Sequence, residues 1–289
     1  MAYCIVTDSS ANLPEEMIER FGLEILSLTV RIEDKEYTSY TKGVKTDLKP
    51  IYDLMRQKKT VETSHVNPGM CVDLFDRLLA QGLDVLYIGF SSGLSGTYQT
   101  AAMALEEAAS KYPERKAYSV DTLAASMGEG LLVYHACLLK EQGGSLEEVR
   151  DWLEANKLHL CHWFTVDDLF HLKRGGRISA ATALAGTMLS IKPVMHMDDA
   201  GHLIPVGKAR GRKASLDALC DHMEKLAIRP EEQIIFISHG DCIEDARYVE
   251  EQVRTRFHVK DVAINYVDPV IGAHSGPGTV ALFFLGTER

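Results

Sequence analysis

The chain has 289 residues, 46% of them hydrophobic, with 41 acidic and 31 basic residues and a formal net charge of −10. This length allows one large domain or two of ordinary size. The acidic balance argues against a general nucleic-acid binder, which is usually basic, and no apolar run is long enough to span a bilayer.

Strand-like and helix-like segments alternate along the chain, which is typical of α/β architecture. We expect strands at residues 3–7, 24–32, 85–88, 117–120, 159–166, 192–197, 202–210, 233–238, 259–265 and 279–285. We expect helices at residues 46–58, 70–81, 98–105, 124–142, 146–156, 167–174, 214–226 and 243–256. Residues 60–69 are predicted to be a polar connection, and residues 198–201 a hairpin turn. A domain boundary is expected near Asn156, which gives domains 1–156 and 157–289.

Two features of the sequence bear on its location. It opens on a strand-like segment, without the charged and apolar regions of a signal peptide. Its six cysteines are scattered and form no C-x-x-C pair. Scattered thiols suit a reducing compartment and buried structural roles, so we expect a cytoplasmic protein.

The stretch 86–102, LYIGFSSGLSGTYQTAA, places a loop rich in glycine and hydroxyl residues between a buried strand and a helix. Three interpretations are open. In the first, Ser95 or Thr97 caps the helix and the glycines only permit the turn. In the second, GLSGT is a hydrolase G-x-S-x-G elbow, although Thr97 replaces the second glycine. In the third, backbone N–H groups and hydroxyls bind a carboxylate or phosphate at the helix start.

Two further clusters carry residue types suited to chemistry. His159, Cys161 and His162 suggest a metal, but on a strand His162 points away from the other two and the spacing is weak. We therefore expect neither metal nor cofactor. Basic residues concentrate in two blocks, Lys173, Arg174 and Arg177, then Lys208, Arg210, Arg212 and Lys213. They indicate either a solvated surface or a patch that docks an acidic partner or phosphate groups.

Eight blocks resemble the DegV family, in the family's order and over the whole chain: IVTDSSANLP at 5–14, TSHVNPG at 63–69, IGFSSGLSGTYQTA at 88–101, VDTLAASMGEG at 120–130, LKRGGRIS at 172–179, IKPV at 191–194, GKARGRKAS at 207–215 and IGAHSGPGTVALFF at 271–284. The resemblance implies two α/β domains with a lipid-binding cleft between them. It implies a fatty-acid-binding protein without catalytic activity of its own. In many bacteria such a protein is the acyl-carrying subunit of a fatty-acid kinase, and a separate kinase protein phosphorylates the bound acid to acyl phosphate.

Carried over to this chain, the resemblance places the carboxylate on two residues and adds three neighbours: Thr63 and Ser95, then Ser64, Ser92 and His274. It also implies that basic residues of the second domain engage the kinase: Arg174, Arg177, Arg210 and Arg212. The chain departs from the family where His65, Val66 and Asn67 replace the commoner Gln-Pro-Ser. This change bears on loop rigidity, because Val66 lacks the fixed φ of proline, and on ligand preference.

Two alternative functions stay open. An esterase would use Ser95 with His274 and form a covalent intermediate, whereas a binder of another small anion would carry a polar ligand. The small-residue stretch 179–190 and the apolar helix around 123–139 are expected either to line an acyl tunnel or to form plain core.

Overall fold

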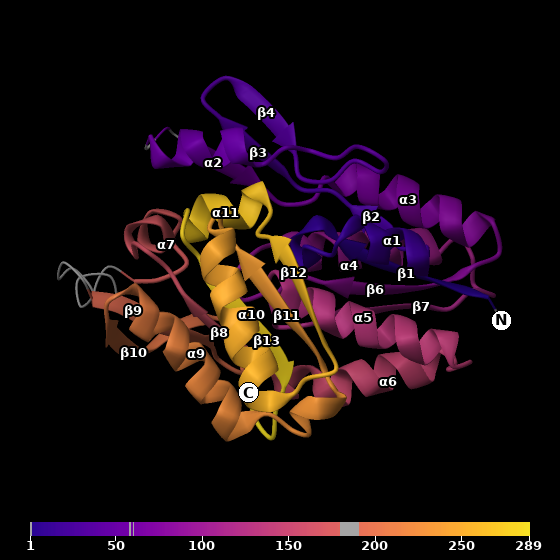
Figure 1. The fold of residues 1–289 in the computed structure, drawn as a ribbon. Helices are drawn as coiled ribbons and strands as arrows, with labels where there is room; N and C mark the ends of the chain where they lie inside the picture. Colours follow the sequence, from indigo (N-terminus) through magenta and orange to yellow (C-terminus); the bar gives the residue numbers. More distant parts are fainter. Residues whose placement is uncertain (1, 58, 60, 180–190) are drawn as a thin grey trace.

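Strands and helices alternate along the chain in the computed structural model, which describes residues 2–57, 59, 61–179 and 191–289 (Figure 1). The described residues form a four-stranded, a six-stranded and a three-stranded sheet, with helices packed against them. The expected α/β class is confirmed. Most of stretch 179–190 lies outside the described residues.

The four-stranded sheet is entirely parallel, with strand order β2-β1-β6-β7. Its strands are β1 (Tyr3–Asp8), β2 (Glu24–Leu26), β6 (Asp84–Gly89) and β7 (Ala117–Asp121). β1 and β6 are buried at every residue, as strands of a parallel sheet covered on both faces must be. One face packs against α3 (Pro68–Ala80) and α4 (Thr97–Ala109). The other packs against α1 (Glu15–Phe21), α5 (Met127–Glu141) and α6 (Leu146–Asn156).

The six-stranded sheet is mixed, with strand order β10-β9-β8-β13-β11-β12. Its strands are β8 (Leu160–Thr165), β9 (Ile191–Met197), β10 (Leu203–Arg210), β11 (Ile234–His239), β12 (Asp261–Tyr266) and β13 (Val280–Leu285). Only β11 and β12 pair in parallel. The hairpin predicted at 198–201 is confirmed between β9 and β10. The associated helices are α7 (Phe170–Arg174), α9 (Arg212–Leu226), α10 (Ile243–Phe257) and α11 (Pro269–Ser275).

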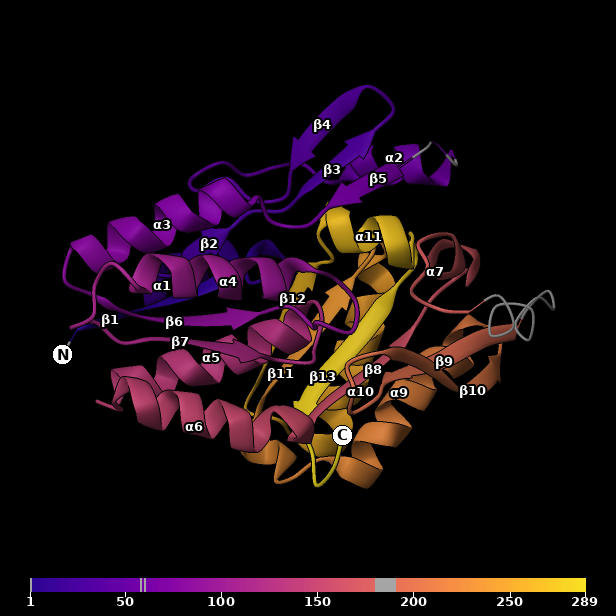
Figure 2. The same cartoon turned by 180° about the vertical axis from the view of Figure 1, so that it is seen from behind.

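The three-stranded sheet was not expected. It joins β4 (Lys35–Thr38), β3 (Thr29–Ile32) and β5 (Val61–Ser64) in antiparallel order and lies with α2 (Lys49–Arg56) above α11 (Figures 1 and 2). The single strand predicted at 24–32 is wrong, because the Leu28 N–H donates to Ser9 Oγ at 3.0 Å and the chain leaves the first sheet there. The polar segment 60–69 leads into a helix as expected, but it also contains β5, a strand that was not expected and that pairs with β3 through its backbone.

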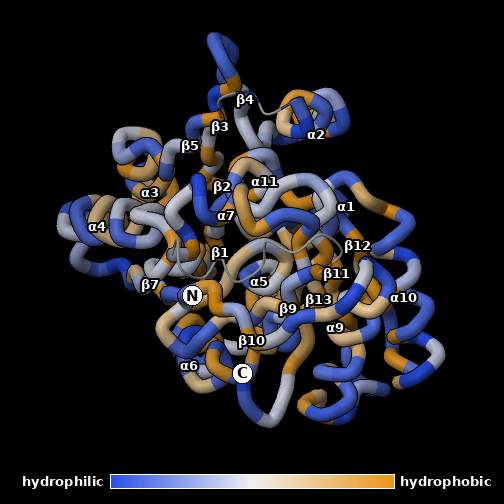
Figure 3. Tube along the Cα trace, turned by 90° about the vertical axis from the view of Figure 1, so that its left-hand side faces the viewer, coloured by the Kyte–Doolittle hydropathy of each residue, from blue (hydrophilic) through white to orange (hydrophobic). Residues whose placement is uncertain are grey.

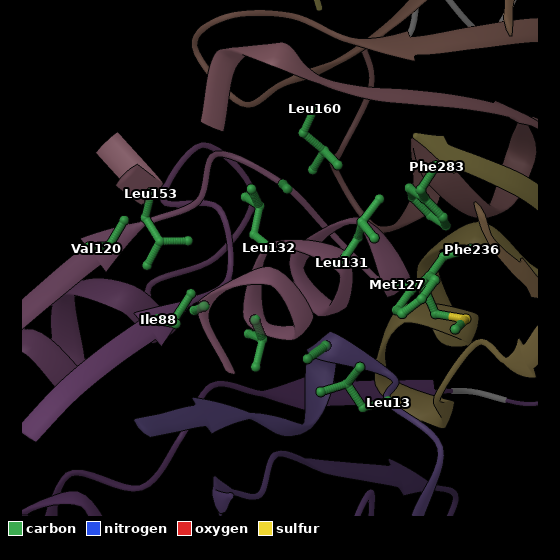
Figure 4. Close-up of a cluster of buried hydrophobic side chains, with 14 of the residues drawn as sticks. Leu13, Ile88, Val120, Met127, Leu131, Leu132, Leu153, Leu160, Phe236 and Phe283 are labelled. Atoms are coloured by element: carbon green, nitrogen blue, oxygen red, sulfur yellow. The ribbon is translucent and has the colours of Figure 1, made fainter. Parts of the chain in front are cut away.

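Helix α5 lies between the two larger sheets and contacts strands of both (Figure 4). Two glycines allow the close approach: a Cβ at Gly128 would lie 2.8 Å from Phe283 Cδ1, and one at Gly130 would overlap Ala11 O. A single buried cluster therefore runs from Ile88 of the first sheet through α5 to Phe283 of the second.

Hydropathy follows this layering. Figure 3 shows hydrophobic colour along the inner strands, whereas an outer helix such as α10 mixes hydrophilic and hydrophobic segments. Among the described residues, no helix is long and apolar enough to cross a membrane. All six cysteines are free thiols, and Cys242 is the only one of them that is not fully buried.

Candidate functional site

A cavity of about 390 Å³ is lined by strand residues of the six-stranded and three-stranded sheets and by residues that follow the strands of the four-stranded sheet, such as Phe90 after β6. Its size falls within the range of small-molecule sites. Much of the wall is apolar, contributed by Leu28, Phe90, Leu94, Phe164, Leu172 and Val270 among others. Polar side chains supply the rest of the lining, so the cavity suits a ligand with both an apolar and a polar part.

One group of polar residues converges at the cavity from three separate elements. Thr63 comes from β5, Ser95 from the loop between β6 and α4, and His274 from α11. The Thr63 Oγ1 and His274 Nε2 atoms lie 2.9 Å apart. Ser64 also lines the cavity, next to Thr63. The structure therefore brings together four of the five residues that the sequence indicated for ligand binding.

Ser92, the fifth, lies outside the cavity lining given by the described residues. Its N–H donates to Asp121 Oδ1 at 3.2 Å. The loop around it is fixed to the β9–β10 hairpin, because Ser91 Oγ donates to Gly201 O at 2.9 Å. Gly93 packs so closely there that a Cβ would lie 2.7 Å from Ala200 O. This loop glycine therefore serves close packing against the hairpin turn.

Ser95 partly caps α4, which was the first interpretation of this loop. Its Oγ accepts the Thr97 N–H at 3.2 Å and lies 2.9 Å from Thr97 Oγ1. The residue at the N-cap position itself is Gly96, which has no side chain to offer. Because Ser95 also lines the cavity, capping and ligand contact are compatible.

His274 is held from two sides. Asp268 caps the start of α11 by accepting the Ile271 N–H at 2.9 Å. On the other side the ring packs against Gly175, where a Cβ would overlap His274 Nδ1. Burial, with smaller effects from Arg177 and Arg174, lowers the pKa of His274 to about 4. The imidazole is therefore neutral at pH 7, with one nitrogen as donor and the other as acceptor.

Arg177 was predicted as a docking residue, but it lines the cavity. Its guanidinium donates to the backbone oxygens of Leu94, at 3.0 Å, and Gly175. Burial lowers the pKa of Arg177, yet an arginine keeps its proton in proteins. A positive charge therefore stands beside the polar group of Thr63, Ser95 and His274, where it favours an anion.

The other predicted docking residues are in different situations. Arg212 is tied to Asp245 at 2.8 Å and to Asp167 at 3.8 Å, so its charge is largely compensated. Arg174 is exposed and lies over the Phe170 ring. Arg210 is exposed at the end of β10.

The geometry does not favour the esterase alternative. A Ser–His–acid arrangement needs the serine bonded to the histidine and an acid on the other ring nitrogen. Here Ser95 bonds Thr97, while His274 bonds Thr63. Within the described part of the chain, His274 Nδ1 has no hydrogen-bond partner.

The described residues contain no group of three or more His, Cys, Asp or Glu side chains arranged to hold a metal ion. The strand predicted at 159–166 begins only at Leu160, because His159 belongs to a short 3-10 turn. His162 is buried and faces the cavity.

Sequence reasoning missed two residues of the polar group. His65 lines the cavity beside Gly96, whose Cβ would lie 3.3 Å from His65 Cδ2. It was singled out only as a departure from the family pattern. Arg177 was assigned to the surface because a basic residue after two glycines carries no signal of the direction of its side chain.

The fold and site together define an α/β protein with a largely apolar cavity and a polar, positively charged group at its wall. The sequence model of a family described as "Uncharacterised protein, DegV family" matches residues 3–287. A DegV domain-containing protein of Clostridium perfringens is 46% identical over 289 residues, which is 99% of this chain and 98% of that protein. The chain belongs to the DegV family.

Solved structures share the fold over nearly the whole length. A DegV family protein from Thermus thermophilus, described by its fatty-acid binding, has a TM-score of 0.86 and 30% identity and covers 99% of this chain and 100% of its own. DegV from Bacillus subtilis, described as a fatty acid binding protein, has a TM-score of 0.84 and 29% identity, with the same coverage.

Proposed function

We propose that the protein binds a long-chain fatty acid in this cavity, with the carboxylate at Thr63, Ser95 and His274. The observation that carries the proposal is the gathering of these polar side chains, with Arg177, on the wall of a cavity whose remaining lining is mostly apolar. The fatty-acid-binding proteins of Thermus thermophilus and Bacillus subtilis, which have the same fold, support it.

Two hydroxyl groups at the proposed carboxylate position can donate a hydrogen bond to the ligand. If the neutral His274 carries its proton on Nε2, it donates to Thr63 Oγ1 across 2.9 Å, which leaves the Thr63 hydroxyl hydrogen for the ligand. The Ser95 oxygen already accepts the Thr97 N–H, so its own hydrogen can point to the ligand. Ser64 stays a proposed neighbour on the cavity wall, where its Oγ contacts Thr29 Oγ1 at 2.5 Å, and Ser92 stays a proposed neighbour that orders the loop through Asp121.

The acyl chain and the carboxylate of the fatty acid would contribute differently to the binding free energy. Burial of about a dozen methylenes stabilises the complex by roughly 10 kcal/mol, whereas each hydrogen bond to a charged carboxylate contributes about 1.5–3 kcal/mol. The apolar wall therefore sets most of the affinity. The polar group sets the position of the carboxylate, which is what a phosphorylating partner needs.

We propose further that the protein has no catalytic activity of its own and presents the acid to a separate cytoplasmic kinase. A carboxylate oxygen forms the new O–P bond, and the kinase's nucleotide loses its terminal phosphoryl group. The exposed Arg174 and Arg210 are the best-placed docking residues. Arg177 and Arg212 belong to the same two basic blocks of the sequence and add positive charge to the docking surface. The concentration of basic residues in an acidic chain supports steering of an acidic partner.

We also propose that residues 1–156 and 157–289 are the two domains. All strands of the parallel sheet precede this boundary and all strands of the six-stranded sheet follow it. The cavity takes lining residues from both sides.

The proposal is tested on purified protein. Denaturing extraction and mass spectrometry should release fatty acid acquired from the expression host, because transfer of an acyl chain out of water is favourable. Stripped protein should bind added long-chain acids in a titration. Absence of both would contradict the proposed function, and covalent labelling of Ser95 by a fluorophosphonate would favour the esterase instead.

A further inference from the structure

The wall of the cavity formed by the six-stranded sheet carries polar groups that a plain acyl chain does not use. Ser238, Ala281 and Phe164 form one row across β11, β13 and β8, and all three line the cavity. His162 lines it too and precedes Phe164 by two residues on β8, so it lies on the same face, roughly 7 Å further along. It pairs with Phe283, near the end of β13 that is far from α11.

His162 lacks a partner for one ring nitrogen. The residue is 4% exposed, its ring lies between Phe164 and Phe283 at centroid distances of 5.4 and 4.7 Å, and among the described residues its Nδ1 has no hydrogen-bond partner. Burial, then the proximity of His196 and Arg289, lowers its pKa well below the usual value. A neutral buried nitrogen without a partner is unfavourable, and such groups usually have a ligand or water as partner.

Ser238 adds a second unused group in the neighbouring row. Ser126 Oγ lies 2.8 Å from Asn12 Oδ1 and 3.0 Å from Ser238 Oγ, and its single hydrogen can serve only one of these acceptors at a time. Asn12 Oδ1 can only accept, so Ser126 donates to it and Ser238 donates its own hydrogen to Ser126 Oγ. Within the described part of the chain no donor reaches Ser238 Oγ, which is therefore open to a hydroxyl hydrogen from a ligand.

We propose that the cavity prefers a fatty acid whose acyl chain carries a hydroxyl group, held by His162. The proposal rests on the proposed function and deepens it. A hydroxyl both donates and accepts, so it can bond either neutral tautomer of His162. A keto oxygen can only accept, and an unsubstituted chain does neither. Ser238, one row closer to α11, is the partner for a hydroxyl nearer to the carboxylate.

The test compares stearic acid with a series of its positional hydroxy isomers, titrated into protein stripped of ligand. The best isomer should bind about three- to tenfold more tightly than stearic acid, which is the effect of one net hydrogen bond. His162→Phe, which keeps a ring but removes both nitrogens, should abolish this preference and bind stearic acid at least as well. Ser238→Ala should lower only the affinity for isomers hydroxylated nearer to the carboxylate.

Two results would overturn the inference: equal binding of all isomers by the wild type, or a preference for one isomer that persists in His162→Phe. In either case, measurable binding of stearic acid would leave the proposed function intact. Loss of binding for every acid would instead count against the proposed function itself. If His162→Phe does not fold, a structure with the best isomer decides. The hydroxyl oxygen should lie within hydrogen-bond distance of a ring nitrogen of His162, and a water there in its place would overturn the inference.

Discussion

Gly175 offers a way to displace His274 without touching any atom that contacts the ligand. The backbone of Gly175 has φ −73°, a conformation that alanine adopts without strain. The added Cβ, however, would overlap His274 Nδ1 and lie 3.1 Å from Cγ and 3.2 Å from Cε1. Gly175→Ala therefore tests the position of the imidazole, while the Gly175 carbonyl that accepts from Arg177 is kept.

The size of the effect follows from these distances. To restore ordinary carbon contacts the imidazole must retreat by roughly 1 Å. The Thr63–His274 hydrogen bond, now 2.9 Å long, would then exceed the useful range. The Thr63 hydroxyl then loses the partner that orients it toward the carboxylate, so the fatty-acid dissociation constant should rise about three- to tenfold, no more than on removal of the Thr63 hydroxyl itself.

The measurement is a titration with one long-chain acid, with thermal unfolding followed in parallel. Gly207→Ala is the matched control, because its Cβ would make an ordinary 3.6 Å contact with Val194 Cβ and should leave the affinity unchanged. If folded Gly175→Ala bound the fatty acid with unaltered affinity, the position of the His274 ring would not matter for binding and the reasoning would be refuted.

Three further predictions concern the same site. Thr63→Val and Ser95→Ala should each weaken acid binding modestly, by about tenfold, and reduce acyl-phosphate formation more strongly, measured in a coupled assay with the kinase. The pKa of His274 is lowered to about 4 in the folded protein and is about 6.5 in the unfolded chain. Its contribution to the free energy of unfolding should therefore decline by up to about 3 kcal/mol as the pH falls from 6.5 to 4, seen as the difference between wild type and His274→Gln in denaturant titrations. Arg174→Glu with Arg210→Glu should reduce kinase coupling and its salt sensitivity while acid binding stays the same.

Each of these predictions has a result that contradicts it. Normal phosphorylation by the Thr63→Val, Ser95→Ala double variant would remove both residues from the head-group site. A wild-type-minus-variant difference that does not change with pH would mean that His274 titrates normally. Arg247→Glu on α10, where the arginine pairs at the surface with Glu244, is the charge control. If the Arg174→Glu, Arg210→Glu variant lost fatty-acid binding and kinase coupling to the same extent, these two arginines would have a structural role and no docking role.

Local sequence signals predicted much of the fold. The helix expected at 146–156 has those bounds, because Ser145 and Glu148 form a capping box that marks its start. The split between β2 and β3 could not be predicted, since it depends on a bond from Leu28 to Ser9, nineteen residues away. β5 was missed because it is only four residues long and half-exposed, and its pairing with β3 leaves no local pattern.

The site could be anticipated in part. Glycine and hydroxyl residues after a buried strand pointed to the loop of Ser95, since such loops meet at the carboxyl end of a parallel sheet. Nothing local indicated that Arg177 turns toward the cavity or that Gly175 supports His274, because both depend on how α7 packs against α11.

The position of α5 between the sheets has a consequence for how a ligand exchanges. Gly128 packs against Phe283 of the other half, and the largest buried cluster runs through α5 into both halves. Separation of the halves would therefore expose that cluster to water. Exchange of a ligand then depends on elements outside that cluster, such as α11, whose apolar residues Val270 and Ala273 belong to a second cluster and which contacts β5. A local displacement of α11 costs less free energy than global unfolding. On the proposed function, the rate of ligand exchange is therefore set separately from the stability of the whole molecule.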